Sequence, residues 1–80
     1  MINIGQTIKE ELERQERSVT WFASKLGCDR QTIYRTFKKY SIDTELLCRI
    51  SIVLQRNFLK ELSDELESLD NAQEEKTTNV

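Results

Sequence analysis

The 80-residue sequence contains no proline, no histidine and only two glycines. Because turn formers are scarce while Glu, Lys, Leu, Arg and Gln are abundant, the composition favours helices joined by short turns. No run of alternating apolar and polar residues is long enough to predict a β-strand. A chain of this length forms one domain at most, with a small core that a second chain would help to complete.

The missing histidine also restricts the chemistry of the chain. Without it, Cys28 and Cys48 cannot complete a four-ligand Cys/His zinc site. The sequence has no glycine-rich phosphate loop and no metal-ligand cluster, so we expect no metal, no cofactor and no enzymatic activity. No apolar run approaches the roughly 18 residues that span a bilayer, and the N-terminus lacks a secretory pattern. We therefore expect a cytoplasmic protein, away from membranes, whose thiols are reduced rather than joined in a disulfide.

The net charge of −2 conceals two parts of opposite sign. Residues 1–60 carry 11 basic and 7 acidic side chains, whereas residues 61–80 carry 1 basic and 7 acidic ones. Residues 17–40 contain six basic side chains and a single acid, Asp29. The sequence thus predicts a basic centre beside an acidic C-terminal end, and each requires its own explanation.

Five N-cap residues, each followed by apolar residues at helical spacing, predict five short helices. Asn3 opens the first helix, in which Gln6 would complete a capping box and Ile4, Ile8 and Leu12 share one face. The polar stretch "KEELERQER" that follows Ile8 is expected to be solvated. The other helices are predicted at residues 19–26 after Ser18, 30–39 after Asp29, 44–55 after Asp43 and 58–69 after Asn57.

The apolar residues of the later helices predict the inner faces and leave some positions open. In helix 30–39, Ile33 and Phe37 lie four residues apart on the inner face. Helix 44–55 offers several apolar positions at helical spacing: Leu46 or Leu47, Ile50, Val53 or Leu54, and in addition Cys48.

The connection between the second and third helices is very short. Only Gly27 and Cys28 separate the end of the second helix from Asp29, the cap of the third. The two helices must therefore cross sharply, which is the layout of a helix-turn-helix. A sharp crossing needs a small residue, here Ala23, and a residue that tolerates positive φ, here Gly27. The apolar side chains spaced to fill the crossing are Phe22, Leu26, Cys28 and Ile33.

The segment "FASKLGCDRQTIYRTF" resembles the helix-turn-helix of the lambda-repressor-like (Cro/C1, or XRE) DNA-binding domains. The resemblance continues through "SIDTELLCRISIVLQRNFLKEL" and covers about residues 3–66. The chain departs from the family at Val19, where relatives carry a glutamine that contacts phosphate, and at Thr36, which is usually aliphatic. It also departs at Trp21, which is usually polar. The resemblance implies a compact five-helix bundle with core positions at Leu46, Ile50, Leu54, Phe58 and Leu62.

The resemblance also implies that the third helix enters the major groove of double-stranded DNA. An arginine can donate two hydrogen bonds to guanine, and a glutamine can bracket adenine. Base contacts would come from Arg30, Gln31, Tyr34 and Arg35, and phosphate contacts from Ser18, Thr20, Lys25, Lys38, Lys39 and Tyr40. The plainer interpretation is that the exposed arginines only solubilise the helix, and that Lys38 and Lys39 only complement its dipole.

A second surface is predicted in the fifth helix, where leucines recur at the spacing of a coiled-coil seam. Leu62 belongs to the core by resemblance, whereas Leu59, Leu66 and Leu69 predict a dimer surface. A dimer would suit the resemblance, because such domains read pseudo-palindromic sites. The acidic residues 70–80 are predicted to be a disordered tail, either simply solvated, competing with DNA, or docking on a partner.

These observations predict a helix-turn-helix domain at residues 1–69, with the motif at about 19–38 and the fifth helix at about 57–69. The expected function is sequence-specific DNA binding by a small homodimeric transcriptional regulator. The alternative is a protein-interaction module, or an antitoxin-like protein, that binds a partner through its C-terminal helix and tail. In a chain of this length we expect no separate ligand-binding domain.

Overall fold

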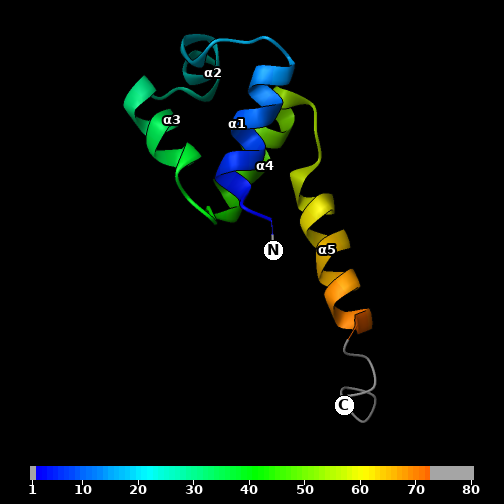
Figure 1. Cartoon of the computed structure of the whole chain (residues 1–80). Coiled ribbons are helices and arrows are strands. Elements are labelled where there is room, and N and C mark those ends of the chain that lie inside the picture. Colours follow the sequence, from blue (N-terminus) through cyan, green and yellow to red (C-terminus); the bar gives the residue numbers. More distant parts are fainter. Residues whose placement is uncertain (1, 73–80) are drawn as a thin grey trace.

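The computed structural model describes residues 2–72 and consists of five α-helices, which confirms the all-α prediction for this part of the chain (Figure 1). No β-strand occurs between residues 2 and 72. The first three residues of the predicted tail belong to the last helix, and residues 73–80, with the disorder predicted there, lie outside the described residues. The helices are α1 (Ile4–Arg14), α2 (Val19–Leu26), α3 (Arg30–Phe37), α4 (Thr44–Leu54) and α5 (Phe58–Ala72).

The helix starts follow from side-chain caps, as predicted. In each case a side-chain oxygen of the cap residue accepts a backbone N–H from the first turn, which satisfies one of the free donors there. The capping box in α1 is only half formed, because the Gln6 amide donates to Glu10, at 3.1 Å, instead of turning back to the backbone of Asn3. The capping distances are 3.2 Å at Asn3, 2.9 Å at Ser18, 2.8 Å at Asp29, 2.8 Å at Asp43 and 2.9 Å at Asn57.

Two helices end earlier than predicted. Helix α4 stops at Leu54 because Gln55 adopts a left-handed conformation with φ of 56°. Helix α3 stops at Phe37, and the chain beyond it turns toward α1, where Gly5 N–H donates to the Lys39 carbonyl at 2.9 Å. A Cβ at Gly5 would lie 2.6 Å or less from three carbonyl oxygens at the end of α3, so only glycine permits this approach.

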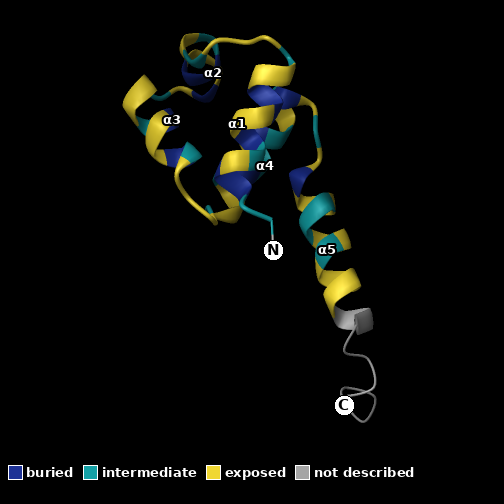
Figure 2. Cartoon of the chain, viewed as in Figure 1, coloured by how far each residue is buried: buried dark blue, intermediate teal, exposed yellow. Residues whose placement is uncertain are grey.

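The core is built from buried side chains of all five helices, which are dark blue in Figure 2. Of the alternative core positions in α4, Leu47 and Leu54 are buried, while Leu46 and Val53 are half-buried. The buried apolar side chains are Ile4, Ile8, Leu12, Phe22, Ala23, Leu26, Ile33, Leu47, Ile50, Leu54 and Phe58. The half-buried ones packed against them include Trp21, Cys28, Phe37 and Leu62.

The inner face of α3 differs from the prediction at one position. Thr36 is buried, whereas Phe37, predicted to be inside, is half-buried. The Thr36 hydroxyl donates to the Thr32 carbonyl at 2.8 Å, and this hydrogen bond satisfies the polar group inside the core. A threonine can therefore occupy this buried position.

The prediction that "KEELERQER" is solvated is wrong at Glu11, whose side chain is only 2% exposed. Its carboxylate accepts hydrogen bonds from Arg14 at the end of α1, from the C-cap residue Gln15 and, at 2.7 Å, from Arg56 just before α5. Arg56 also pairs with Glu61 at 2.5 Å, and Gln15 donates to the Leu54 carbonyl. This cluster, which we call the Glu11 cluster, fixes the end of α1 to the junction of α4 and α5.

Candidate nucleic-acid interface

The turn between α2 and α3 sets the orientation of the exposed face of α3. Gly27 adopts a left-handed conformation with φ of 73° and ψ of 33°, as predicted. The N–H of Gly27 donates to Ser24 and that of Cys28 to Ala23, at 3.2 and 3.0 Å, so the end of α2 is capped. Arg49 of α4 adds a further hydrogen bond to the Leu26 carbonyl. This contact was not predicted, because no local pattern links α4 to the end of α2.

The four predicted base contacts lie together on one exposed face of α3. Arg30, Gln31, Tyr34 and Arg35 are all exposed, while Ile33 on the opposite face is buried. Tyr34 is 47% exposed and its ring meets Phe37 edge-on, with 6.4 Å between the ring centroids. The Arg35 guanidinium reaches back along the helix and donates to the Thr32 hydroxyl at 3.2 Å.

The charged side chains among the four predicted base contacts are both arginines. Among the described residues, neither Arg30 nor Arg35 forms an ion pair. The one acid close by, Asp29, is occupied as the cap of α3, and the hydrogen bond from the Thr32 N–H lowers the pKa of its carboxyl. The positive charge of Arg35 lowers this pKa further, so the carboxylate stays ionised as a cap.

The predicted phosphate contacts lie around α3 and are exposed. Ser18 is the cap of α2, with its oxygen accepting from Trp21 N–H, and Thr20 lies two residues further in the first turn, so both stand at a helix N-terminus. Tyr40, 76% exposed, belongs to the segment after α3 that is held to α1 by backbone hydrogen bonds. All six side chains are therefore free of the core: Ser18, Thr20, Lys25, Lys38, Lys39 and Tyr40.

Two further cations beside this surface were not among the predicted contacts. Lys9 of α1 and Arg17, between α1 and α2, line a pocket together with Tyr34 and Lys38 of the predicted interface. The Arg17 guanidinium stacks on the Trp21 ring, 4.5 Å from its centroid. Their charge and position in the sequence were visible, but their proximity to α3 depends on how α1 packs against it.

The predicted dimer residues form an exposed apolar face on α5. Leu59, Leu66 and Leu69 are 36%, 65% and 43% exposed, whereas Leu62 is half-buried against the core. Figure 1 shows α5 leading away from the other helices beyond its first turns. The Glu65 carboxylate accepts the Ile2 N–H at 2.8 Å, so the middle of α5 is tied to the N-terminal segment.

The described residues hold no group of three or more Cys, Asp or Glu side chains arranged to bind a metal ion. Within residues 2–72, no helix is both long and apolar enough to cross a membrane. Comparison with protein-family models, with curated proteins and with solved structures finds no match to this chain.

Proposed function

We propose that this protein is a small sequence-specific DNA-binding protein of the lambda-repressor-like type, which regulates transcription by inserting α3 into the major groove. The observation that carries the proposal is the exposed face of α3, where Arg30, Gln31, Tyr34 and Arg35 stand together and form no ion pair within residues 2–72. These side chains match the donor and acceptor patterns of guanine and adenine in the major groove. Such a protein would act in the cytoplasm, on the DNA that it regulates.

The surroundings of α3 support the same proposal. A helix that enters the major groove needs cations and N–H groups on both sides to bind the two phosphate strands. The N-terminus of α2, with Ser18 and Thr20, is on one side, and Lys38, Lys39 and Tyr40 follow α3 on the other. Phosphate binding of this kind makes affinity strongly dependent on salt.

The salt dependence gives a direct test of the phosphate contacts. We expect the double variant Lys38→Gln, Lys39→Gln to bind a random-sequence duplex more weakly and with a shallower dependence of log K on log salt. The slope should change by about 2, since each lost phosphate contact changes it by about 0.9. The measurement is a fluorescence anisotropy titration at several salt concentrations. Lys60→Gln removes a charge from α5 and should leave the slope unchanged; a slope in the double variant equal to that of the parent contradicts the assignment.

The exposed leucines of α5 support a homodimer. A single module of this kind covers only a few base pairs, and two copies would read half-sites about 34 Å apart. We expect sedimentation equilibrium to give a dimer for the parent and a monomer for the variant Leu66→Asp, Leu69→Asp, because the charges would be placed in the seam. Ile52→Asp is the matched control, since Ile52 is 75% exposed on α4, outside the seam. An unchanged mass in the double variant rules out this seam.

The second candidate function is a protein-interaction module of antitoxin-like type, and the same α5 favours it. Leu66 and Leu69 are flanked by acidic residues such as Glu67, so a basic partner with an apolar groove would also fit this helix. The two functions differ in what the arginines of α3 do. An interaction module would keep its partner when Arg30 and Arg35 are replaced, whereas a DNA reader would lose its site.

A further inference from the structure

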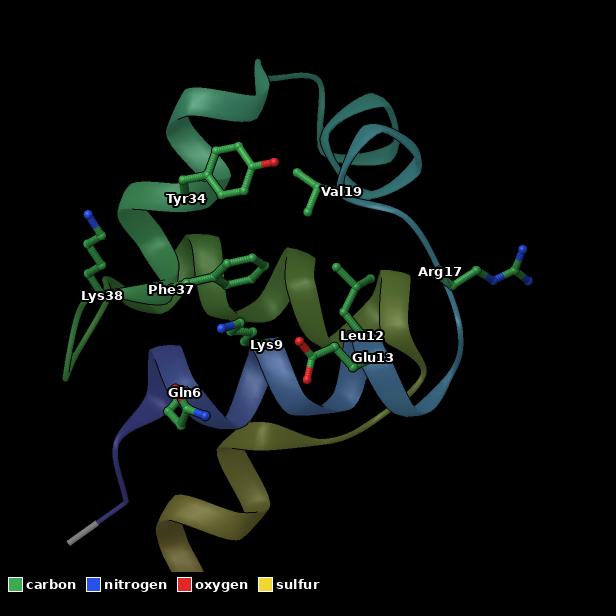
Figure 3. Close-up of a pocket in the computed structure, with 9 residues that line it drawn as sticks. All are labelled: Gln6, Lys9, Leu12, Glu13, Arg17, Val19, Tyr34, Phe37 and Lys38. Carbon is green, nitrogen blue, oxygen red and sulfur yellow. The ribbon is translucent and has the colours of Figure 1, made fainter.

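A pocket of about 360 Å³ opens between α1, the start of α2 and the second half of α3 (Figure 3). Its floor is apolar, with the buried Leu12, the half-buried Val19 and Phe37, and the Tyr34 ring. In Figure 3 the Tyr34 and Phe37 side chains extend from α3 across the pocket toward the side where Val19 and Leu12 lie. The volume is within the range of sites for small molecules, and the apolar lining is typical of them.

The rim of this pocket is positively charged. The lining includes three cations, Lys9, Arg17 and Lys38, and a single acidic side chain, Glu13. Within the part of the chain that the structure describes, none of these four side chains forms an ion pair. In Figure 3, Lys9 and Glu13 extend from α1 in the middle of the view, while Lys38 and Arg17 lie at opposite ends with their charged groups directed outward. None of the three cations is therefore neutralised by a carboxylate in this part of the chain, although Arg17 already stacks on the Trp21 ring.

We propose that this pocket binds a small organic anion. The ligand would place an aromatic or branched aliphatic body on the Leu12, Val19 and Phe37 floor, and one carboxylate, sulfonate or phosphate group at the cationic rim. A DNA phosphodiester strand fits less well, because the apolar floor offers it no hydrogen-bond donors in exchange for its hydration. The positive charge of the rim favours a ligand with a negative group, and the apolar floor favours a ligand with an apolar body.

A second pocket in the molecule serves as an internal comparison. It measures about 240 Å³, lies between the N-terminal segment, the α3–α4 connection and α5, and has no charged side chain in its lining. An apolar compound can enter either pocket, but an anionic compound gains an electrostatic contribution only at the first. Selectivity for the anion is therefore the property that distinguishes the proposed site.

The pocket would also regulate DNA binding, and this part of the proposal rests on the proposed function. Tyr34 and Lys38 line the pocket and belong to the proposed DNA interface. A bound anion would hold the Tyr34 ring and neutralise part of the charge beside α3, so occupancy and DNA binding would oppose each other. The helical domain itself would then respond to a ligand.

The test uses two probes that share one ring system. Anilinonaphthalene sulfonate carries a sulfonate, and phenylnaphthylamine is the same body without it. We expect saturable one-to-one binding of the sulfonate, at least about 10-fold tighter than the neutral probe, with three rim cations each contributing the modest energy of an exposed ion pair. Amide NMR shifts should centre on Lys9, Val19 and Phe37. The Lys9→Glu variant should bind the sulfonate probe about 10-fold more weakly and the neutral probe as the parent does. The Lys60→Glu variant, changed on α5, should bind both probes as the parent does.

Several outcomes would overturn the proposal. The first is the absence of saturable binding, and the second is equal affinity for both probes. The third is a set of NMR shifts centred on Ile42 and Leu47 of the second pocket. The fourth is a loss of sulfonate affinity in Lys60→Glu equal to that in Lys9→Glu. A DNA duplex that shifts the Leu12 and Val19 amides while the sulfonate does not would assign the pocket to the DNA interface instead. Because the probes are titrated without DNA, the pocket is tested even if the protein binds no DNA. An unchanged DNA affinity in saturating sulfonate would overturn the regulatory part alone.

Discussion

Replacing Glu11 by alanine is expected to lower the free energy of unfolding by about 3 kcal/mol, because a buried carboxylate with several charged partners is removed. The Glu11 side chain is 2% exposed and holds Arg14, Gln15 and Arg56. The expected loss of stability is at the lower end of the range for breaking a buried ion pair, because Arg56 keeps its second partner, Glu61. Thermal unfolding followed by circular dichroism should show a melting temperature lower by roughly 15 °C.

The matched control for this variant is Glu13→Ala. Glu13 lies two residues further along α1 and is exposed, so its replacement should change stability by no more than about 0.5 kcal/mol. Equal effects of the two substitutions would show that the Glu11 cluster does not hold α1 to α5. Because α5 carries the proposed dimer face, the Glu11→Ala variant should also dimerise more weakly.

The same cluster predicts how stability depends on pH. Hydrogen bonds from Arg14, and further ones from Gln15 and Arg56, lower the pKa of Glu11 from 4.5 to about 2. A carboxyl whose pKa is lowered on folding contributes stability above its unfolded value, and this contribution is lost as pH falls from about 4.5 to about 2. The parent should therefore lose about 2–3 kcal/mol over this window, and Glu11→Gln should lose correspondingly less. Parallel pH profiles for the two proteins would contradict the assignment.

Replacing both Arg30 and Arg35 by alanine is expected to weaken binding to a selected DNA site by about 4 kcal/mol, or roughly a thousandfold. Each arginine can donate two hydrogen bonds to a guanine, and each such pair contributes about 1–3 kcal/mol of discrimination. Both side chains are exposed, so the unfolding temperature should stay close to that of the parent. Anisotropy titration against the selected site and a scrambled duplex measures the loss.

The control variant keeps the positive charge at residues 30 and 35 but replaces the planar guanidinium groups. In the variant Arg30→Lys, Arg35→Lys the net charge is unchanged, but an ammonium group cannot reproduce the two parallel hydrogen bonds of a guanidinium. We expect this variant to bind the scrambled duplex as the parent does and to lose most of its preference for the selected site. Full preference in the lysine variant would mean that the two arginines contribute charge and do not read bases.

The features that could be predicted from the sequence depend on neighbouring residues. The caps at Ser18 and Asp29 and the left-handed Gly27 are local, and they fix the boundaries and turn of α2 and α3. The exposed face of α3 follows from helical period, so Arg30 and Arg35 could be placed on one side before the structure was known.

The features that could not be predicted depend on contacts between distant segments. Glu11 is buried because Arg56, 45 residues later, meets it, and nothing near Glu11 indicates this. Gly5 is needed because α1 approaches the carbonyl groups at the end of α3. The pocket beside Tyr34 likewise depends on the packing of α1 against α3, although each of its lining residues was visible in the sequence.

The most direct measurement of the central claim is selection from a random duplex library, followed by titration of the enriched pool at several salt concentrations. The proposed function predicts an enriched motif of approximate two-fold symmetry, with half-sites about one helical turn apart and an affinity that falls steeply with salt. A pool without an enriched motif, bound weakly and only at low salt, would contradict it. The exposed arginines of α3 would then not read DNA, and the leucine face of α5 would become the first place to look for a partner.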